Sequence, residues 1–583
     1  MSEQKRKEIY DHRPYTREEM VRELGIPEAV LSRFFPKADG HVRKRDGRRV
    51  ATWSGKLIRK MLQQRRVQRA IQSAERGRDR QQAALDYLGT FDIENLRQEA
   101  ETLRRRFVLH IGPTNSGKTW QALQALEQAE RGVYLGPLRL LALEMFDTMN
   151  HDGVPCHLLT GEESIWVGNA RHIASTIELA DCTEDYDVAV IDEAQMITDA
   201  GRGDRWMRAI YGIRATEVHI CMAPEAQTLI CGILDSFAAP YTFVEHKRLA
   251  PLVWQGSFRD LSETQPGDAL IVFSRKAVLA TAAELQTRGI AASVIYGALP
   301  PVSRREEVRR FTEGETSVVV ATDAIGMGVS LPIRRVIFCE TEKFDGQKRR
   351  PLRSGEIKQV AGRAGRFGIY DKGYVLSMTD AGRVRMALTC PEKQQERMII
   401  PFPEEALEGD FPIDLLLNAW NNLPREGAFS RVDMSDALIL YRFMGERAKR
   451  IDRRLLFSMI TCPMDTASEH LMGYWLDCCM AIVRREELPE PPSGTDSLEA
   501  CERRYKELDI RHQLLRRIGV EEDRMDEKLA LCERINRFLR EEQETHLRRC
   551  SECGVRLPPT WPSGLCDRCW QRLRRTREGN HRA

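Results

Sequence analysis

The chain has 583 residues, a length that predicts about three to five domains. Its 42% hydrophobic and 30% charged residues are typical of a globular chain with a formal net charge of +3. No run of about 18 apolar residues occurs, which excludes a transmembrane helix, so we expect no membrane partner. The opening MSEQKRKEIYDHRPY is not typical of a secretory signal or a transit peptide.

Charge is distributed unevenly along the chain. Residues 41–80 contain 14 Lys and Arg residues against three acidic residues, and the tail after Cys566 is also rich in arginine. Basic ends on a nearly balanced chain favour a polyanionic partner, although a solvated helix face would give the same pattern.

The first 62 residues predict a basic, helix-turn-helix-like module. Thr16 is a helix cap with Glu19 three residues on, and an apolar face ends at Gly25. A second short helix over Pro27–Phe35 and a hairpin within HVRKRDGRRVATW follow. Such modules bind DNA or RNA in some proteins and are scaffolds in others, and the sequence leaves these alternatives open. Residues 63–104 predict a helical connector.

Between residues 105 and 400, short apolar runs alternate with helical stretches, which predicts parallel sheets of the doubly wound α/β class. We expect two such domains, over 105–248 and 249–400. The runs expected to form strands are Phe107–Ile111, Gly132–Leu135, Val188–Ile191, Val218–Met222, Ala269–Phe273, Val318–Ala321 and Val336–Cys339.

A Walker A motif lies between the first of these strands and the next helix. Its glycines let backbone N–H groups approach phosphates at the positive end of the helix. Lys118 is expected to neutralise the β- and γ-phosphates, and Thr119 to bind Mg²⁺. The predicted ATP-binding residues are Gly112, Pro113, Thr114, Asn115, Ser116, Gly117, Lys118 and Thr119.

Two adjacent carboxylates end the strand at residues 188–191. Asp192 is expected to hold Mg²⁺, and Glu193 to polarise the attacking water as general base. With the Walker A motif, this pair predicts an ATPase.

Residues 321–328 and 359–366 predict the second half of the ATP site. QVAGRAGR is the QxxGRxGR element of superfamily-two helicases, with Gln359 at its start. Arg363 and Arg366 are spaced to lie on one face of a helix and to reach the γ-phosphate as arginine fingers. Asp323 and Gly326 are expected in the loop that faces the nucleotide.

Residues 401–548 predict a helical C-terminal region. The Pro-rich segment 487–495 predicts a linker, and the alternating Glu and Arg of 496–548 predict a solvated helical hairpin.

The last residues, 549–583, predict a Cys₄ zinc module with a basic tail. Two CxxC pairs separated by 12 residues can place four thiolates around one tetrahedral Zn²⁺. A redox role is the alternative, and the module could grip nucleic acid, contact a protein or only stabilise the chain. The predicted ligands are Cys550, Cys553, Cys566 and Cys569.

Seven blocks of sequence together resemble the mitochondrial degradosome RNA helicases of the Suv-three type and their bacterial relatives. A weaker resemblance, at 457–464, is to the start of that family's helical region. The blocks are IGPTNSGKT (111–119), GPLRLLALE (136–144), LLTGEE (158–163), VIDEAQM (190–196), VIYGALPP (294–301), ATDAIGMGVSLPIRRVIF (321–338) and QVAGRAGRFG (359–368).

The resemblance implies two tandem RecA-like P-loop domains that form an NTP-driven 3′-to-5′ unwinding motor on single-stranded RNA. It also implies a row of residues that hold the phosphate backbone without reading its sequence. Carried over by position, these are Pro137, Arg139, Thr160 and Gly161 in the first domain and Ser274, Arg275, Gly297 and Thr322 in the second.

The sequence differs from that of helicases in general at two places. Residues 221–226 read Cys-Met-Ala-Pro-Glu-Ala where Ser-Ala-Thr is usual, so the coupling between domains is specific to the family. No glutamine motif for adenine is found upstream of Leu109, which predicts loose selectivity among NTPs.

The favoured interpretation is therefore an ATP-dependent RNA helicase in RNA metabolism or decay, with ATP or another NTP, Mg²⁺ and a structural Zn²⁺. Expected partners are single-stranded or partly duplex RNA, with DNA as an alternative, and a nuclease or other decay protein. A DNA helicase or translocase and an ATP-switched regulator without unwinding remain as rivals. The missing targeting signals favour the bacterial cytoplasm, with a mitochondrial or other organellar site as the alternative.

Overall fold

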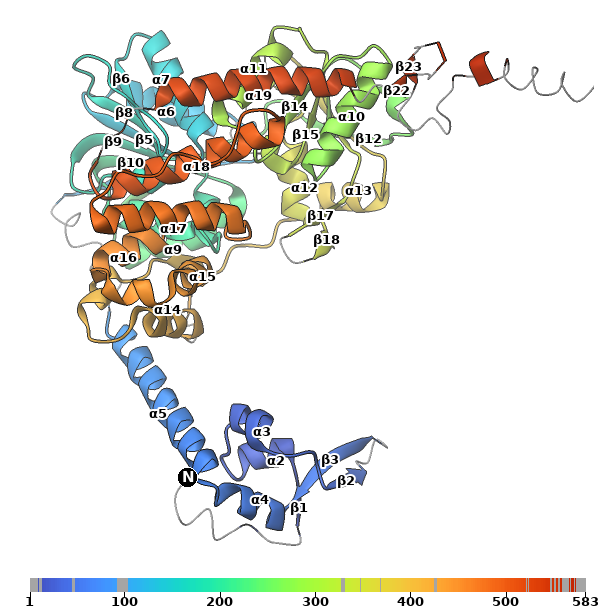
Figure 1. The fold of residues 1–583 in the computed structure, drawn as a ribbon. Helices are drawn as coiled ribbons and strands as arrows, with labels where there is room; N and C mark the ends of the chain where they lie inside the picture. Colours follow the sequence, from blue (N-terminus) through green and yellow to red (C-terminus); the bar gives the residue numbers. More distant parts are fainter. Residues whose placement is uncertain are drawn as a thin grey trace, which may run out of the picture. The chain divides into compact units, whose positions relative to one another are not determined.

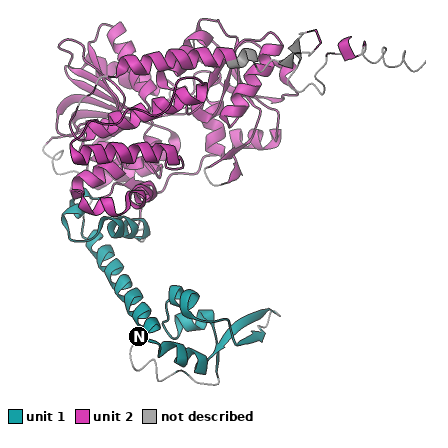
Figure 2. Ribbon diagram, in the orientation of Figure 1, with its two compact units in different colours: residues 1–92, 403–423 teal, residues 93–402, 424–583 magenta. Residues whose placement is uncertain are grey.

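The computed structural model divides the chain into two compact units (Figure 2). Unit 1 comprises residues 1–92 and 403–423, and unit 2 comprises residues 93–402 and 424–583. The structure describes residues 9, 13–43, 48–91, 103–326, 331–345, 348–366, 368–423, 427–520, 522, 524–545, 548–549, 552–553, 556–557, 566, 568–570 and 572.

Unit 1 has a small antiparallel sheet of order β1-β3-β2, on which short helices pack. The predicted cap at Thr16 is confirmed, since its hydroxyl accepts a hydrogen bond from the Glu19 N–H in a full capping box. The elements are β1 (Pro14–Thr16), α2 (Arg17–Arg22), α3 (Glu28–Phe34), β2 (Gly40–Arg43), β3 (Arg49–Ser54), α4 (Gly55–Leu62), α5 (Arg65–Leu88), η8 (Glu404–Glu408) and α14 (Ile413–Asn422).

Residues 403–423 belong to unit 1 because they pack on the end of α5. The Tyr87 ring lies 5.3 Å from the Phe411 ring, and a Cβ at Gly409 would lie 2.7 Å from the Tyr87 hydroxyl. Glycine is therefore required at position 409 for this close approach.

The first α/β domain of unit 2 contains an eight-stranded sheet of order β11-β4-β10-β9-β5-β8-β6-β7, parallel except at β7. Strands β5, β6, β8, β9 and β10 of this sheet are labelled in Figure 1. Its strands are β4 (Arg106–Ile111), β5 (Gly132–Gly136), β6 (Cys156–Leu159), β7 (Ser164–Ile165), β8 (His172–Thr176), β9 (Asp185–Ile191), β10 (Arg214–Met222) and β11 (Tyr241–Glu245). Its α-helices are α6 (Lys118–Gln128), α7 (Arg139–His151), α8 (Gly203–Gly212) and α9 (Gln227–Ser236).

The second α/β domain contains a six-stranded, fully parallel sheet of order β12-β19-β16-β13-β15-β14. The two sheets confirm the expected tandem RecA-like α/β domains. The sheet strands are β12 (Leu252–Ser257), β13 (Asp268–Ile271), β14 (Ala292–Ile295), β15 (Val318–Ala321), β16 (Arg335–Phe338) and β19 (Gly373–Ser377), beside a hairpin of β17 (Glu342–Phe344) and β18 (Arg349–Pro351). The helices are α10 (Arg275–Thr287), α11 (Pro301–Thr312), α12 (Ser354–Ala361) and α13 (Ala381–Thr389).

The C-terminal region is helical, as predicted, apart from short strand pairs. None of the helices in the described part of the chain is long and apolar enough to cross a membrane. The remaining α-helices and strands are β20 (Met398–Ile400), β21 (Phe429–Arg431), α15 (Ser435–Met444), α16 (Arg453–Ile460), α17 (Glu469–Arg484), α18 (Leu498–Arg517), α19 (Met525–Thr545), β22 (Arg548–Arg549) and β23 (Arg556–Leu557), with the 3-10 helix η9 (Gly445–Arg450) between α15 and α16.

The hairpin of α18 and α19 is not a solvated appendage, so that part of the prediction is wrong. Buried Leu498, Cys501 and Leu508 of α18 join the core of the second α/β domain, together with Leu531 and Ile535 of α19. The apolar face of the hairpin packs against the second α/β domain, where α19 contacts α10 and α11. Charged residues of the hairpin pair with one another.

Candidate ATP site and nucleic-acid track

The Walker A loop lies between β4 and α6, as the sequence predicted. Gly117 caps α6 with φ 80°, in the left-handed region that favours glycine. A Cβ at Gly112 would lie 2.6 Å from the Ser116 hydroxyl and 2.7 Å from the His246 carbonyl oxygen, so only glycine fits. The loop therefore brings its backbone N–H groups and the α6 N-terminus to one point.

Two polar side chains of this loop are buried but have few hydrogen-bond partners among the described residues. Lys118 is 6% exposed, and its Nζ lies 3.4 Å from the Pro113 carbonyl oxygen. The buried Ser116 hydroxyl has no hydrogen-bond partner among the described residues. A buried amine and an unsatisfied hydroxyl at a helix N-terminus fit the phosphates of a nucleotide.

The carboxylate of Asp192 is directed at Thr119. The Thr119 hydroxyl lies 3.2 Å from Asp192 Oδ1, and the Tyr134 hydroxyl donates to Oδ2 at 2.9 Å. Burial and the neighbouring Glu193 raise the pKa of Asp192, whereas Lys118 opposes this shift. A paired hydroxyl and carboxylate are ligands that Mg²⁺ prefers, and a cation there would favour the ionised carboxylate.

Glu193 occupies a strained position, with φ 51° in a residue that is not glycine. Its carboxylate accepts a hydrogen bond from Gln195 Nε2, and the Ala223 N–H donates to Gln195 Oε1 at 3.1 Å. Gln395 Nε2 donates in turn to the Gln195 carbonyl oxygen at 2.9 Å. Gln195 and Gln395 thus join Glu193 to the unusual 221–226 segment, links that the sequence interpretation did not assign.

Arg363 and Arg366 do not lie on a helix, which corrects the prediction. Helix α12 ends at Ala361, and both arginines follow in the next turn, so their spacing does not set their direction. Arg363 Nε donates to the Gly326 carbonyl oxygen at 2.9 Å, and Gln359 side-chain atoms lie next to Gly326. Burial lowers the pKa of Arg363, while the negative charges of Glu193, Glu144 and Asp192 act to raise it. Arg363 therefore lies close enough to the carboxylates of Asp192 and Glu193 for their charges to act on it.

Residues 362–366, called here the arginine loop, also contact the Walker A loop directly. Asn115 Nδ2 donates to the Gly365 carbonyl oxygen at 2.8 Å. Arg248 Nη1 donates to the carbonyl oxygens of Thr114 and Gly362, each at 2.9 Å, and burial lowers its pKa to about 10. Arg248 was missed because a single arginine between two domains carries no sequence signal.

Asp323, which is expected to face the nucleotide, pairs with a lysine of the same domain. Its carboxylate lies 2.8 Å from Lys343 Nζ of the β17–β18 hairpin, and this amine also pairs with Glu356 at 3.0 Å. Met327 and Gly328 of the same motif lie outside the described residues.

The four predicted backbone-binding residues of the first domain lie near one another. Arg139 begins α7, pairs with Glu162 and Asp509, and has its guanidinium 3.4 Å from the position of a Cβ on Gly161. The buried Thr160 hydroxyl accepts from the Glu163 N–H at 3.1 Å. The carbonyl oxygen of buried Pro137 accepts a hydrogen bond from Arg202 Nη2.

Two of the four predicted backbone-binding residues of the second domain, Ser274 and Arg275, lie at the start of α10. The Ser274 hydroxyl caps this helix by accepting from the Ala277 N–H at 3.1 Å, and Arg275 Nε lies 3.3 Å from a Glu502 carboxylate oxygen. Gly297 has open space at its Cα, and the Thr322 hydroxyl accepts from the Ala324 N–H at 3.3 Å. Glu502 and Asp509, both on α18, are thus contact residues that the sequence did not reveal.

Three of the four predicted zinc ligands converge. The Sγ atoms of Cys553, Cys566 and Cys569 lie within 4.8 Å of one another, and the Cys553–Cys566 distance is 3.6 Å. The Cys569 N–H donates to Cys566 Sγ at 3.4 Å. Cys550 lies outside the described residues.

Two family models match the region that contains both α/β domains. Residues 94–246 match the DEXQ-box helicase domain of Suv3, and residues 255–368 match the helicase conserved C-terminal domain.

Curated relatives match about half of this chain. The mitochondrial DExH-box ATP-dependent RNA helicase DExH16 of Arabidopsis thaliana is 45% identical over 46% of this chain and 48% of its own length. The mitochondrial ATP-dependent RNA helicase SUV3 of Oryza sativa subsp. japonica is 42% identical over 48% of this chain and 50% of its own length. The mitochondrial ATP-dependent RNA helicase SUPV3L1 of Homo sapiens is 40% identical over 48% of this chain and 37% of its own length. The chain therefore spans half or less of the length of these relatives.

These names contradict the expected bacterial cytoplasmic location, because the curated relatives are mitochondrial proteins. The matched residues are the ones that carry the ATP site and the predicted backbone contacts. Residues 94–246 are thus similar to the DEXQ-box helicase domain of Suv3, and residues 255–368 to the helicase conserved C-terminal domain.

Proposed function

We propose that this protein is an ATP-dependent RNA helicase that moves 3′ to 5′ on single-stranded RNA. The observation that carries the proposal is the position of Arg363, which comes from the second α/β domain yet lies in the field of Glu193 and Asp192 of the first. Relatives named as ATP-dependent RNA helicases support the choice of RNA.

In the proposed mechanism, Lys118 and the N-terminus of α6 hold the β- and γ-phosphates of ATP. Thr119 and Asp192 would hold Mg²⁺, which would neutralise charge on the phosphate oxygens. Glu193 orients and polarises the attacking water. These assignments account for the buried Lys118 and Ser116 and for the Thr119–Asp192 contact.

Arg363 and Arg366, together with Gln359, complete the site from the second domain. We infer that the arginines stabilise charge on the γ-phosphate only when the two domains are closed, which couples hydrolysis to domain movement. The hydrogen bonds of Asn115 and Arg248 to the arginine loop support a closed state in which the two halves touch.

The test is steady-state ATP hydrolysis by the whole protein without nucleic acid, with single-stranded RNA and with single-stranded DNA of matched length. RNA should stimulate hydrolysis more than DNA does, and Lys118→Ala should abolish the signal because it removes the phosphate contact. Equal or greater stimulation by DNA would replace the RNA helicase with a DNA motor, and no stimulation would favour an ATP-switched binding protein.

We also infer that Cys550, Cys553, Cys566 and Cys569 hold a structural Zn²⁺. With Zn–S bonds of about 2.3 Å, tetrahedral thiolates lie about 3.8 Å apart. The Cys553–Cys566 distance of 3.6 Å fits this geometry. Elemental analysis of the purified protein should give about one zinc per chain, and Cys566→Ser should lose it; a metal-free protein with intact helicase domains would contradict the site.

The relatives' names lead us to propose the mitochondrial matrix as the place of action. A nuclease or other decay partner remains a prediction, as do the domain boundaries drawn from the sequence and loose selectivity among NTPs. A panel of NTPs in the hydrolysis assay tests that selectivity, and strict use of ATP would contradict it.

A further inference from the structure

One face of α18 pairs with both arginines that are expected to hold the nucleic-acid backbone. Asp509 Oδ2 lies 3.2 Å from Arg139 Nη2 of the first domain, and Glu502 Oε2 lies 3.3 Å from Arg275 Nε of the second. Glu502 and Asp509 are seven residues apart, which is about two turns and places them on the same side of the helix. A single helix thus supplies one carboxylate to each domain.

Other residues of this face contact the same two places. The Tyr505 hydroxyl, between the two acids, donates to Glu162, the partner of Arg139. Arg516 Nη1 donates to the Thr160 carbonyl oxygen at 2.5 Å, and the Tyr296 hydroxyl, next to Gly297, donates to Glu502 Oε1 at 2.6 Å. The α18 face therefore covers the positions that the backbone of a bound strand is expected to occupy.

The helix that carries this face is anchored to the second domain. Besides its shared apolar core, the Ser303 hydroxyl donates to the Cys532 carbonyl oxygen of α19 at 3.3 Å. The carboxylates therefore cannot leave the arginines by a simple rotation of the hairpin, and the contacts with the first domain must break when the two domains separate.

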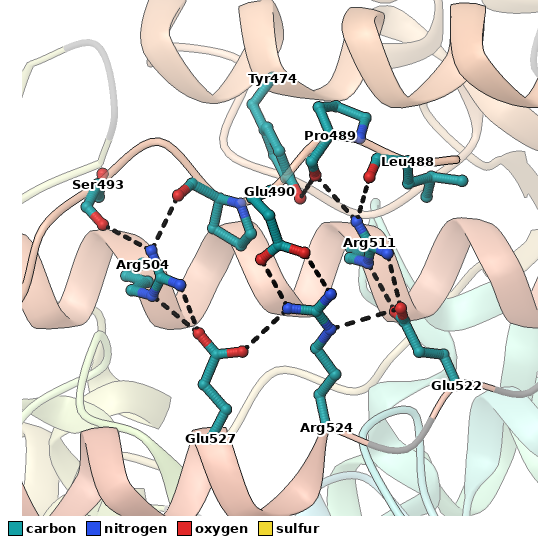
Figure 3. Close-up of polar contacts among 11 residues, drawn as sticks. Tyr474, Leu488, Pro489, Glu490, Ser493, Arg504, Arg511, Glu522, Arg524 and Glu527 are labelled. Atoms are coloured by element: carbon teal, nitrogen blue, oxygen red, sulfur yellow. Dashed lines mark hydrogen bonds and ion pairs between the residues drawn. The ribbon is translucent and has the colours of Figure 1, made fainter. Parts of the chain in front are cut away.

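A network of arginines stiffens the hairpin on its other side (Figure 3). Arg511 donates to the carbonyl oxygens of Leu488 and Pro489 at 2.8 and 2.9 Å, and it makes two bonds of 2.6 Å to Glu522. Arg524 joins Glu490 to Glu522 and Glu527 in the same network. The Pro-rich segment is thus fastened along α18, which makes the hairpin a rigid carrier.

The ion pairs are partly shielded from water, so they matter energetically. Glu502 is 8% exposed and Asp509 19%, against 32% for Arg275 and 26% for Arg139. Charge pairs of this kind are worth more than those on an open surface, and a competing anion must replace them to reach the arginines.

We propose that Glu502 and Asp509 are specificity-determining residues that occupy the phosphate-binding arginines until two phosphates of a strand displace them. This inference rests on the proposed function of Arg139 and Arg275 in binding RNA. The two carboxylates compete with RNA phosphates for Arg139 and Arg275. An RNA strand is therefore bound stably only when it contacts both domains at once.

The experiment compares RNA affinity of the whole protein with that of the double variant Glu502→Gln/Asp509→Asn. Both changes keep the shape of the side chain and remove its charge. Fluorescence anisotropy with a labelled single-stranded RNA, without nucleotide, measures Kd. We expect the double variant to bind about tenfold more tightly, because Arg275 loses the charge of Glu502 and Arg139 loses that of Asp509 while it keeps its ion pair with Glu162.

Glu499→Gln/Glu533→Gln is the matched control, since it removes the same charge from exposed positions of α18 and α19. It should leave Kd within about twofold of the wild type. Thermal unfolding shows whether the variants fold. If the double variant does not fold, the single substitutions Glu502→Gln and Asp509→Asn replace it, and each should increase RNA affinity by a smaller factor.

Unchanged or weaker binding by the double variant would overturn the proposal, as would an equal gain in the control. Failure of the wild type to bind RNA at all would overturn the proposed function as well. RNA binding by the wild type without a gain in the double variant would overturn only the role of the acids.

Discussion

Three histidines form a hydrogen-bonded chain that leads to the Walker A loop. His110 Nε2 lies 2.8 Å from His219 Nδ1, and His110 Nδ1 lies 3.1 Å from His246 Nε2. Burial, with a smaller effect of His219 and then His246, lowers the pKa of His110 to about 4. All three pKa values are shifted downward, so the folded protein holds these imidazoles neutral.

This arrangement makes stability depend on pH in one direction. The stabilising effect of a neutral His110 is complete above its ordinary pKa of about 6.5 and is lost as the pH falls towards 4, because the unfolded chain binds the proton more readily. When the pH is lowered from 7 to 5, the free energy of unfolding of the wild type should therefore fall by about 1–3 kcal/mol more than that of His110→Gln. Urea unfolding at the two pH values measures both. An identical loss in both proteins would contradict the assignment.

Gly112 tests the close packing of the Walker A loop. A methyl group there would meet the Ser116 hydroxyl and the His246 backbone, so Gly112→Ala should weaken ATP binding about tenfold or more. Equilibrium titration with a fluorescent ATP analogue measures this effect. Gly232→Ala in α9 is the control, because nothing lies within 4 Å of its added Cβ. Equal affinity in the two variants would show that the loop has room.

At the scale of elements, the Pro-rich segment 487–495 depends on the arginines of α18. Arg504 bonds the carbonyl oxygens of Pro491 and Ser493 at 2.9 and 3.0 Å and pairs with Glu527, as Arg511 does with its own partners (Figure 3). Replacing either arginine removes its hydrogen bonds to the backbone carbonyls of this segment and breaks an ion pair, which leaves Glu522 or Glu527 paired with Arg524.

We expect Arg511→Met to lower the free energy of unfolding by about 2–4 kcal/mol and to expose the segment to limited proteolysis. Arg503→Met should change the free energy of unfolding by less than about 0.5 kcal/mol, because the Arg503 side chain is 42% exposed and pairs only with Glu499 among the described residues. Thermal unfolding and the rate of cleavage within 487–495 are the measurements. A stable, protease-resistant Arg511→Met protein would contradict the anchoring role.

Local signals in the sequence were sufficient for the centre of the ATP site. The apolar runs that became β4, β9 and β15 are largely buried inner strands, and their motifs follow at the carboxyl ends, where local pattern and tertiary position agree. Short or half-exposed strands were missed. Strand β14 has a serine, Ser293, within its four residues, and the edge strand β12 mixes apolar with polar positions, so neither gives a continuous apolar run.

Contacts between distant residues could not be predicted in this way. Asp509 lies 370 residues from Arg139, and no pattern along α18 distinguishes an acid that pairs across domains from one that faces water. The alternation of Glu and Arg suggested a solvated hairpin because intramolecular pairs, such as Arg511 with Glu522, have the same composition as a solvated surface. The direction of Arg363 was misjudged because α12 ends two residues before it.

At the scale of the whole molecule, the ATP site requires both α/β domains of unit 2. Lys118 and Glu193 come from one domain and Arg363 from the other, so in the proposed mechanism we expect efficient hydrolysis only when the second domain closes on the nucleotide. Residues of α18 contact both domains as well, which would tie the proposed nucleic-acid track to the same movement.

The most direct test of this account is ATP-driven displacement of a strand from an RNA duplex that carries a 3′ single-stranded tail. The same duplex with a 5′ tail sets the polarity, and Arg363→Ala removes the contribution of the second domain. We expect displacement from the 3′-tailed duplex with ATP, and hydrolysis reduced about 10³-fold in Arg363→Ala. Hydrolysis stimulated by RNA without displacement of either duplex, or full activity in Arg363→Ala, would contradict the account.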